Sequence, residues 1–169
     1  MPRFPLARTC AALLCLTLTA CATGYHSASN PVLGFTGGYW DEPGPGRTWR
    51  VGVTGNAHLS AERAGAYLLY RCAEVSLREG GTHFVVYPSL SAAVSDDRQA
   101  GLGIGTGAKP YATVYLWIAP ADTEHAYAAE EVLARLGPVV RPGRVGTGSD
   151  RSGASSALQV KPASAGAGP

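Results

Sequence analysis

The stretch SAERAGAYLLYRCAEVSLREGGTHFVVYP, residues 60–88, decides the fold because it joins an amphipathic helix to a strand. Ser60 suits the N-cap of the helix, since its hydroxyl can accept a hydrogen bond from a free amide of the first turn. Two glycines at positions 80 and 81 are expected to end the helix, because glycine readily adopts the left-handed conformation found after helix C-termini. The pattern therefore predicts a helix over 61–79. Apolar residues recur on one of its faces at helical spacing and form a core stripe: Ala61, Ala64, Leu68, Cys72 and Val75.

Three segments predict strands, because apolar and polar residues alternate in them or β-branched and aromatic residues dominate. The first covers residues 49–54, with Trp49, Val51 and Val53 on one face. The second covers residues 82–87. The third and clearest covers residues 111–119.

A second helix is predicted after the third strand. Asp122 or Thr123 caps it, and it ends at Leu136 before a Gly-Pro pair. Residues 89–110 predict an exposed loop with room for a weak hairpin. The order of elements predicts an α+β fold. It would be one small two-layer domain, an antiparallel or mixed sheet of three to four strands with two helices on one face.

The first 21 residues carry the features of an exported lipoprotein. Arg3 and Arg8 precede an apolar run over 11–20 that is too short to span a bilayer, which needs about 20 apolar residues. The run ends in Leu-Thr-Ala before Cys21, and this ending resembles the bacterial lipobox. The resemblance implies that residues 1–20 are a lipoprotein signal peptide and that the thiol of Cys21 is acylated. An ordinary secretory signal with a chance cysteine is the alternative.

An acylated Cys21 would hold the protein on a membrane, since two or three acyl chains anchor stably where one binds reversibly. Ala22 follows in place of the Asp that usually retains lipoproteins in the inner membrane. The resemblance therefore implies the periplasmic face of the outer membrane. Without residues 1–20, 12 basic and 12 acidic residues remain. A neutral chain with no cluster of Lys and Arg lacks the footprint of nucleic-acid binding.

Composition divides the rest of the chain into three parts. Residues 21–46 are rich in Gly, Ser, Pro and Asn and predict a flexible tether with a reach of roughly 25–30 Å. Within it, the three aromatic residues of the run 34–40 suit either a loose first strand or packing over the edge of the domain. Residues 47–140 hold the predicted elements of the α+β domain. Residues 141–169 predict a disordered tail, because 19 of these 29 residues are Gly, Pro, Ser or Ala and bury little apolar surface.

No arrangement of residues predicts a catalytic or metal site. The four histidines do not pair with each other or with Cys72 at metal-ligand spacing, and Cys72 suits a small apolar core position. The glycine-rich stretch 101–108 precedes a strand rather than a helix N-terminus, so it does not fit a phosphate loop. Asp96 and Asp97, beside Arg98, predict a solvated loop. We therefore expect no cofactor, no metal and no enzymatic activity.

One edge of the first helix is open to two interpretations. Tyr67, Tyr70, Arg71 and Glu74 lie on neighbouring turns. In the first interpretation they flank the core, with phenol oxygens reaching water and an Arg71–Glu74 pair. In the second they form an interaction surface for a partner, because Tyr and Arg are favoured at interfaces. Tyr111, Tyr115 and Trp117 on one face of the third strand raise the same question.

The chain contains four short blocks: Gly-Asn at 55–56, SAER at 60–63, LLYRCAEV at 68–75 and GGTHF at 80–84. Together they resemble a family of small bacterial outer-envelope lipoproteins of unknown function. The similarity covers residues 21–88 and includes the lipobox cysteine and a Gly-Tyr pair near the tether. It implies that Cys72 stands where an alanine is common, which agrees with a packing role. The family brings no activity or ligand.

The sequence thus predicts a non-catalytic envelope lipoprotein that acts by protein or cell-wall contacts. The alternative is a small-ligand-binding or hydrolytic periplasmic domain, which would use the Tyr67/Arg71/Glu74 edge and the loop over 89–110. A purely structural surface protein is a third possibility.

Overall fold

The computed structural model of the chain describes residues 23–98, 104–105 and 111–142. The predicted signal peptide, Cys21, and all but the first two residues of the predicted disordered tail lie outside the described residues. No helix in the described ranges is long and apolar enough to cross a membrane.

The described residues form an α+β domain with an antiparallel sheet. In the sheet the strands lie in the order β1-β2-β5-β3-β6, and β4 pairs with β5 outside this order. The sheet is therefore wider than the predicted three to four strands. The elements are η1 (Gly34–Thr36), β1 (Gly38–Pro43), β2 (Thr48–Thr54), α2 (Ala61–Arg78), β3 (His83–Tyr87), α3 (Leu90–Val94), β4 (Ile104–Gly105), β5 (Tyr111–Ala119), β6 (Tyr127–Ala128) and α4 (Ala129–Val140).

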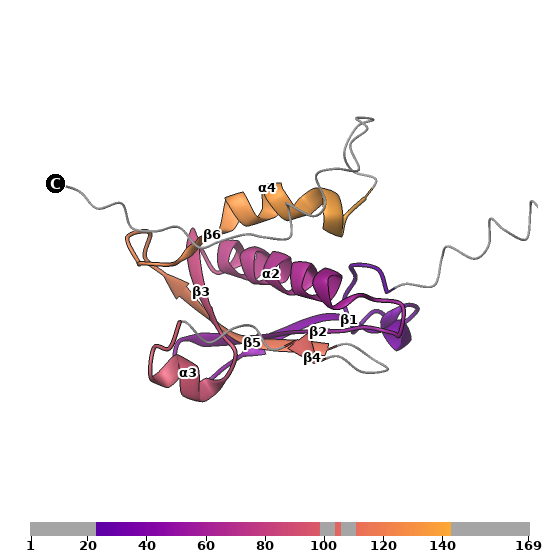
Figure 1. Cartoon of the computed structure of the whole chain (residues 1–169), viewed down its shortest axis with the longest axis horizontal. Coiled ribbons are helices and arrows are strands. Elements are labelled where there is room, and N and C mark those ends of the chain that lie inside the picture. Colours follow the sequence, from indigo (N-terminus) through magenta and orange to yellow (C-terminus); the bar gives the residue numbers. More distant parts are fainter. Residues whose placement is uncertain (1–22, 99–103, 106–110, 143–169) are drawn as a thin grey trace, which may run out of the picture.

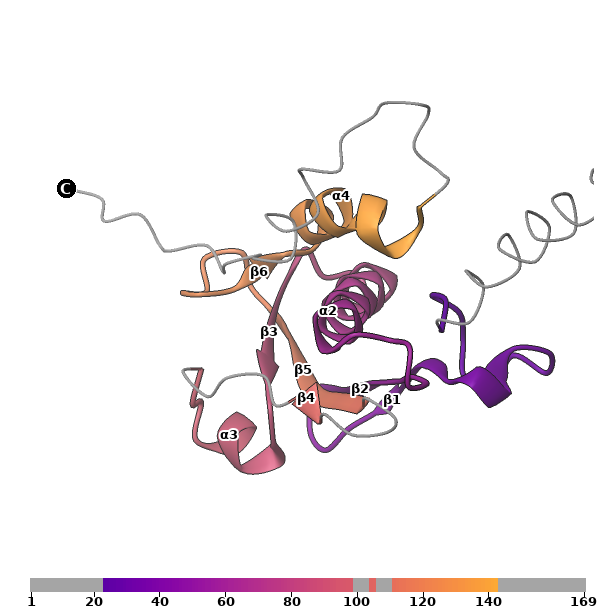
Figure 2. The ribbon, with the colours of Figure 1, turned by 45° about the vertical axis from the view of Figure 1, so that its right-hand side comes forward.

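The helices lie in separate layers. Helix α2 covers one face of the sheet and α4 packs on α2, so α4 adds a third layer rather than sharing the second (Figure 1). Helix α3 lies on the opposite side of the sheet, next to β3, as the turned view also shows (Figure 2). The predicted α+β class is confirmed. The predicted two-layer arrangement is wrong, because α4 packs on α2 as a third layer and α3 lies on the opposite side of the sheet.

The packing of α2 on the sheet forms the core, as the apolar stripe predicted. Ser60 caps the helix by accepting a hydrogen bond from the amide of Arg63 at 3.2 Å. Leu68, Cys72 and Val75 are buried against the inward-facing residues of β2 and β5. Burial raises the pKa of the Cys72 thiol, so it stays protonated as a small apolar group. The core assignment of Cys72 is confirmed.

The second predicted helix starts later than the sequence indicated. After β5 the chain turns, with His125 in the left-handed region at φ 58°. It then returns as β6, which pairs with β3, before α4 begins at Ala129. Asp122 and Thr123 are therefore not helix caps. The Gly-Pro pair does not end the helix either: α4 includes both residues and ends at Val140, where buried apolar side chains hold its last turn.

The predicted loop over 89–110 contains two short elements. Ser89 caps α3 by accepting a hydrogen bond from the amide of Ala92 at 3.1 Å. Residues Ile104 and Gly105 form β4 and pair with β5 in antiparallel register. The partner of β4 lies outside the segment 89–110, so the described residues show no hairpin within it.

The segment predicted as a flexible tether belongs to the domain from residue 23 onward. Strand β1 pairs with β2 along its whole length, and Thr23 is buried. The glycines and serines of this segment suggest a linker, but its aromatic residues pack on α2. The centroid of the Tyr25 ring lies 4.6 Å from that of Tyr39 and 5.4 Å from that of Tyr67 in α2. The domain therefore starts before residue 47. It also extends past residue 140, since Arg141 is the C-cap of α4.

Candidate functional site

The predicted helix edge is part of the core. Tyr67 and Tyr70 are only 2% and 8% exposed. The hydroxyl of Tyr67 donates to the backbone oxygen of Thr23 at 3.3 Å, and the ring of Tyr70 meets that of Tyr25 edge-on at 5.2 Å. Two buried tyrosines offer no contact area to a partner. The burial therefore supports the interpretation of this edge as a flank of the core.

Arg71 is the centre of an ion-pair network on this flank. Its Nε and Nη2 donate to Oδ1 of Asp41 at 2.8 and 2.6 Å, and its Nη1 donates to Oε2 of Glu74 at 2.8 Å. The guanidinium also lies over the ring of Tyr39, 4.4 Å from its centroid. The predicted Arg71–Glu74 pair is confirmed. It forms part of a larger group that ties β1 to α2.

Two further arginines complete the network. Arg78 donates to Oδ2 of Asp41 at 2.7 Å, and Arg141 donates to Oε1 of Glu74 at 2.6 Å. The hydroxyl of Tyr25 donates to the second oxygen of Glu74 at 2.5 Å. Both carboxylates are thus satisfied within the protein. This arrangement ties β1 and the residue after α4 to α2.

The pKa of Asp41 follows from these contacts. Burial acts to raise it, but the hydrogen bonds from Arg78 and Arg71 prevail and hold the pKa below its ordinary value. Burial and the hydrogen bond to Glu74 both raise the pKa of the Tyr25 phenol, so it remains a donor. At neutral pH Asp41 is therefore ionised and paired with the two arginines, and the Tyr25 hydroxyl keeps its proton.

The opposite face of the sheet carries a row of aromatic side chains. The register places Tyr87 beside Tyr115 and Thr48 beside Trp117 on this face. Farther along the face, Trp40 lies over Gly52, whose missing Cβ leaves room for the indole. A Cβ at that position would sit 2.3 Å from the ring. Helices α2 and α4 lie on the other side of the sheet (Figure 1). On the outer face, Tyr87 and Ala92 of α3 belong to a second, smaller buried cluster, and Tyr115 and Trp117 pack against it while remaining partly exposed.

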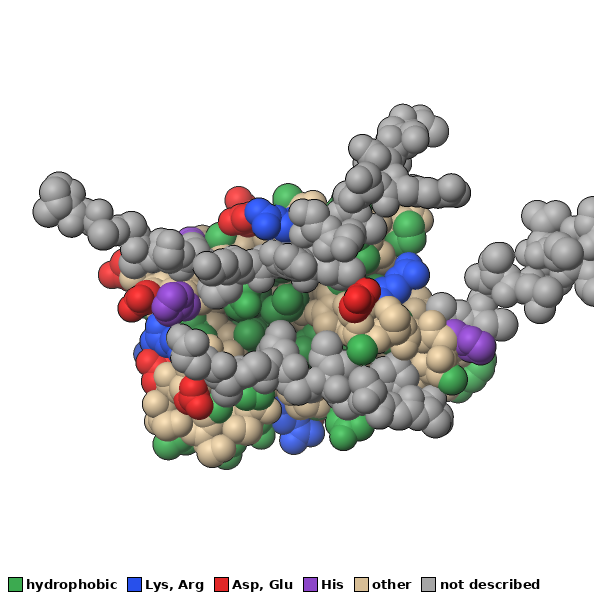
Figure 3. All heavy atoms as spheres, viewed as in Figure 1, with side chains coloured by type: hydrophobic (Ala, Val, Ile, Leu, Met, Phe, Trp, Pro, Cys, Tyr) green, Lys and Arg blue, Asp and Glu red, His purple; other side chains and the backbone are tan. Residues whose placement is uncertain are grey.

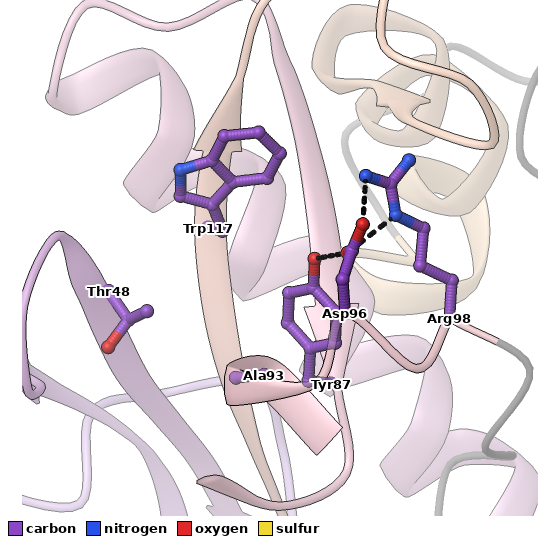
Figure 4. A pocket seen from close by; sticks show the side chains of 6 residues that line it. All are labelled: Thr48, Tyr87, Ala93, Asp96, Arg98 and Trp117. Carbon is purple, nitrogen blue, oxygen red and sulfur yellow. Dashed lines mark hydrogen bonds and ion pairs between the residues drawn. The ribbon is translucent and has the colours of Figure 1, made fainter. Parts of the chain in front are cut away.

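A cavity of about 250 Å³ opens on this outer face, next to α3. Figure 4 shows the indole of Trp117 on one side of it, and on another the hydroxyl of Tyr87 pointing to the carboxylate of Asp96. Strands β2, β3 and β5, helix α3 and the turn after α3 all contribute. The lining residues are Thr48, Tyr87, Ala93, Asp96, Arg98 and Trp117.

An ion pair holds the polar side of the cavity. Nε and Nη2 of Arg98 each donate to one oxygen of Asp96 at 2.7 Å, and Nη1 donates to the backbone oxygen of Glu124 at 2.7 Å. The hydroxyl of Tyr87 donates to Oδ1 of Asp96 at 2.5 Å. The turn that makes this contact places Asp96 in the left-handed region at φ 52°.

The protonation states in the cavity follow from the ion pair. The hydrogen bonds from Arg98 and then Tyr87 lower the pKa of Asp96, while burial and the bond to Asp96 raise the pKa of Tyr87 to about 12. At neutral pH the carboxylate is ionised and paired, and the phenol is protonated. The cavity therefore offers an aromatic wall and polar groups for binding, without an activated nucleophile.

Sequence analysis missed the role of Asp96 and Arg98. It predicted a solvated carboxylate loop, and Asp96 is indeed half exposed, but its oxygens are bound by Arg98 and Tyr87. The only local signal was an Asp-Asp-Arg run after a small-residue segment. Among the residues that the structure describes, no group of three His, Cys, Asp or Glu side chains could hold a metal ion.

Comparisons of the chain with protein-family models, curated proteins and solved structures give no match. The resemblance of residues 21–88 to envelope lipoproteins stays a prediction. The geometry and chemistry of the sites are therefore the basis for a functional proposal.

Replacing Asp41 by Asn should destabilise the domain at pH 7 by about 3 kcal/mol, because the change leaves Arg71 and Arg78 without their anion. The pKa of Asp41 is depressed in the folded state. Its contribution is therefore present above the ordinary carboxyl pKa and is lost as the pH falls through the folded value. Urea unfolding of the parent protein and of Asp41→Asn should show a difference in the free energy of unfolding that becomes smaller below about pH 4.

The neighbouring residue of β1 provides a matched control. Glu42 pairs with Arg50, but both side chains are about half exposed, so Glu42→Gln should change the stability by less than about 1 kcal/mol. Equal losses for Asp41→Asn and Glu42→Gln would show that the network contributes no more than an ordinary surface pair.

Proposed function

We propose that this protein is a bacterial envelope lipoprotein, anchored through acylated Cys21, which acts without catalysis by binding an envelope protein or cell-wall polymer. The periplasmic face of the outer membrane is the proposed location. The observation that carries the binding role is the aromatic outer face of the sheet, with its cavity beside Trp117. This face replaces the Tyr67–Glu74 edge as the proposed interaction surface.

The chemistry of the outer face suits binding. Aromatic side chains provide large contact area at a low cost in side-chain entropy, and both Tyr and Trp also carry a polar group. Trp40, Tyr115 and Trp117 are all partly exposed on this face, and the guanidinium of Arg50 lies 5.0 Å from the ring of Trp40. Such a surface can stack on sugar rings or pack against apolar side chains of a protein.

The paired state of the polar groups supports a non-catalytic role. The Cys72 thiol is buried, Asp96 is neutralised by Arg98, and Tyr87 keeps its proton at neutral pH. Basic and acidic side chains lie in small separate groups on the face shown in Figure 3, so we do not propose a nucleic-acid partner.

A second candidate function is the binding of a small ligand in the cavity. The alternative first expected at the Tyr67/Arg71/Glu74 edge would then use Tyr87, Asp96 and Arg98. The ion pair and the indole of Trp117 face the same hollow (Figure 4). Pockets of this kind combine an apolar wall with a few placed polar groups.

The anchor is tested by replacing Cys21 with Ala in cells supplied with a labelled fatty acid. We expect the label to disappear from the protein, because the acylated thiol is gone, and the protein to leave the membrane fraction. Cys15→Ala, a cysteine six residues earlier in the chain, is the matched control and should keep the label. Label that persists in Cys21→Ala would show that Cys21 is not the acylated residue.

The binding face is tested by a photo-reactive phenylalanine in place of Tyr115, which lies on the outer face beside Tyr87. Irradiation of living cells should link the protein to one reproducible partner. The same group in place of Glu131, an exposed position on α4, is the matched control and should give no such product.

Two results would count against the outer face. Equal products from positions 115 and 131 would indicate random contacts. No product at 115, together with a higher melting temperature in the presence of an envelope metabolite, would favour the small-ligand alternative.

A further inference from the structure

A loop near the start of the described chain exposes large apolar side chains. Phe35 is 86% exposed, Val32 70% and Leu33 45%. They lie within four consecutive positions around η1, at the end of the domain opposite α3 in both ribbon views (Figures 1 and 2). Contiguous exposed apolar side chains mark sites of interaction with proteins or membranes.

Hydrogen bonds to the side chain and backbone of Asn30 hold this loop in a defined shape. Oδ1 of Asn30 accepts from the amides of Val32 and Leu33 at 2.9 and 3.0 Å. The backbone oxygen of Asn30 accepts from Gly34 at 2.8 Å. At Gly34 a Cβ would lie 2.3 Å from the oxygen of Ala28, so the close approach of the backbone requires glycine. The apolar side chains are thus presented by a preorganised turn.

Thr23 is fixed directly beside the same loop. Its hydroxyl donates to the backbone oxygen of Thr36 at 2.7 Å and accepts from the amide of Asn56 at 2.9 Å. Its own backbone oxygen accepts from the hydroxyl of Tyr67 at 3.3 Å. Thr23 is only 2% exposed. The chain is therefore attached to the domain at the base of the apolar loop.

The length of chain between Thr23 and Cys21 then limits the distance to the membrane. Two residues span about 7 Å even when fully extended. A lipid on Cys21 would therefore hold Thr23, and the loop beside it, at the level of the lipid headgroups. The predicted reach of roughly 25–30 Å required residues 21–46 to be a free tether, and most of that segment is folded into the domain.

We propose that the loop over residues 31–36 inserts Val32, Leu33 and Phe35 into the interfacial region of the bilayer that holds the acyl chains. This inference rests on the proposed acylation of Cys21. Apolar side chains gain from burial at the boundary of headgroups and acyl chains. Residues 22–40 contain no Asp or Glu, so the segment carries no carboxylate that an anionic lipid surface would repel.

The test uses the full acylated protein with an environment-sensitive nitrobenzoxadiazole dye on Phe35→Cys. The protein is reconstituted in vesicles of phosphatidylethanolamine and phosphatidylglycerol, with or without nitroxide on the lipid chains. The dye emission should shift to shorter wavelength and be quenched by the nitroxide lipids. Val32→Cys provides a second label position, and both side chains are exposed, so neither change should disturb folding. The parent protein, treated with the same dye, gives the background fluorescence. We expect this background to be low because its Cys72 is buried.

The matched control is the same dye on Val94→Cys. Val94 is 81% exposed on α3, at the other end of the domain, and its dye should show neither the shift nor the quenching. A fatty-acid label on the protein with equal signals from positions 35 and 94 would overturn the docking while leaving the anchor intact. A shift at position 35 without nitroxide quenching would show that the loop is covered by protein rather than by lipid, which also overturns the docking. Absence of fatty acid on the protein would overturn the anchor and the docking together.

Discussion

The ion pairs of Arg71 fix the position of the first strand and of the chain before it. Asp41 is 9% exposed, and a charge so placed requires partners inside the protein. Arg71 and Arg78 provide them from α2, while β1 is also bound to β2 by backbone hydrogen bonds. The N-terminal segment is therefore held on two sides. The described domain therefore includes the chain from Thr23 onward, two residues after the predicted lipid anchor.

Local sequence signals were sufficient for the central elements. The periodicity and the Ser60 cap predicted α2 within a residue of its observed end, and alternation predicted β5 at its observed bounds. Strands β1 and β6 and the start of α4 depend on partners far along the chain. Asp41 meets Arg71 thirty residues later, and β6 forms only because the edge of β3 is available. No local pattern contains that information.

The same distinction applies to the sites. Helical spacing grouped Tyr67, Tyr70, Arg71 and Glu74 correctly, but it could not show that Tyr25 and Thr23 would cover the two tyrosines. The outer face of β5 followed from alternation. Its cavity did not, because Asp96 reaches Tyr87 only through α3 and a left-handed turn. The resulting arrangement separates two surfaces, an apolar loop beside the anchor and an aromatic face on the sheet.

Hydrogen exchange of the membrane-bound protein, measured by peptide, tests directly whether the segment behind the anchor is part of the domain. If Arg71 holds β1 on α2, the amides of residues 38–42 that are hydrogen-bonded to β2 should exchange nearly as slowly as those of residues 48–54, because both strands would open with the core. Exchange of residues 38–42 at the rate of an unfolded chain, with residues 48–54 and 111–119 still protected, would contradict the structure. The segment would then be a tether, and the loop would not be held at the membrane.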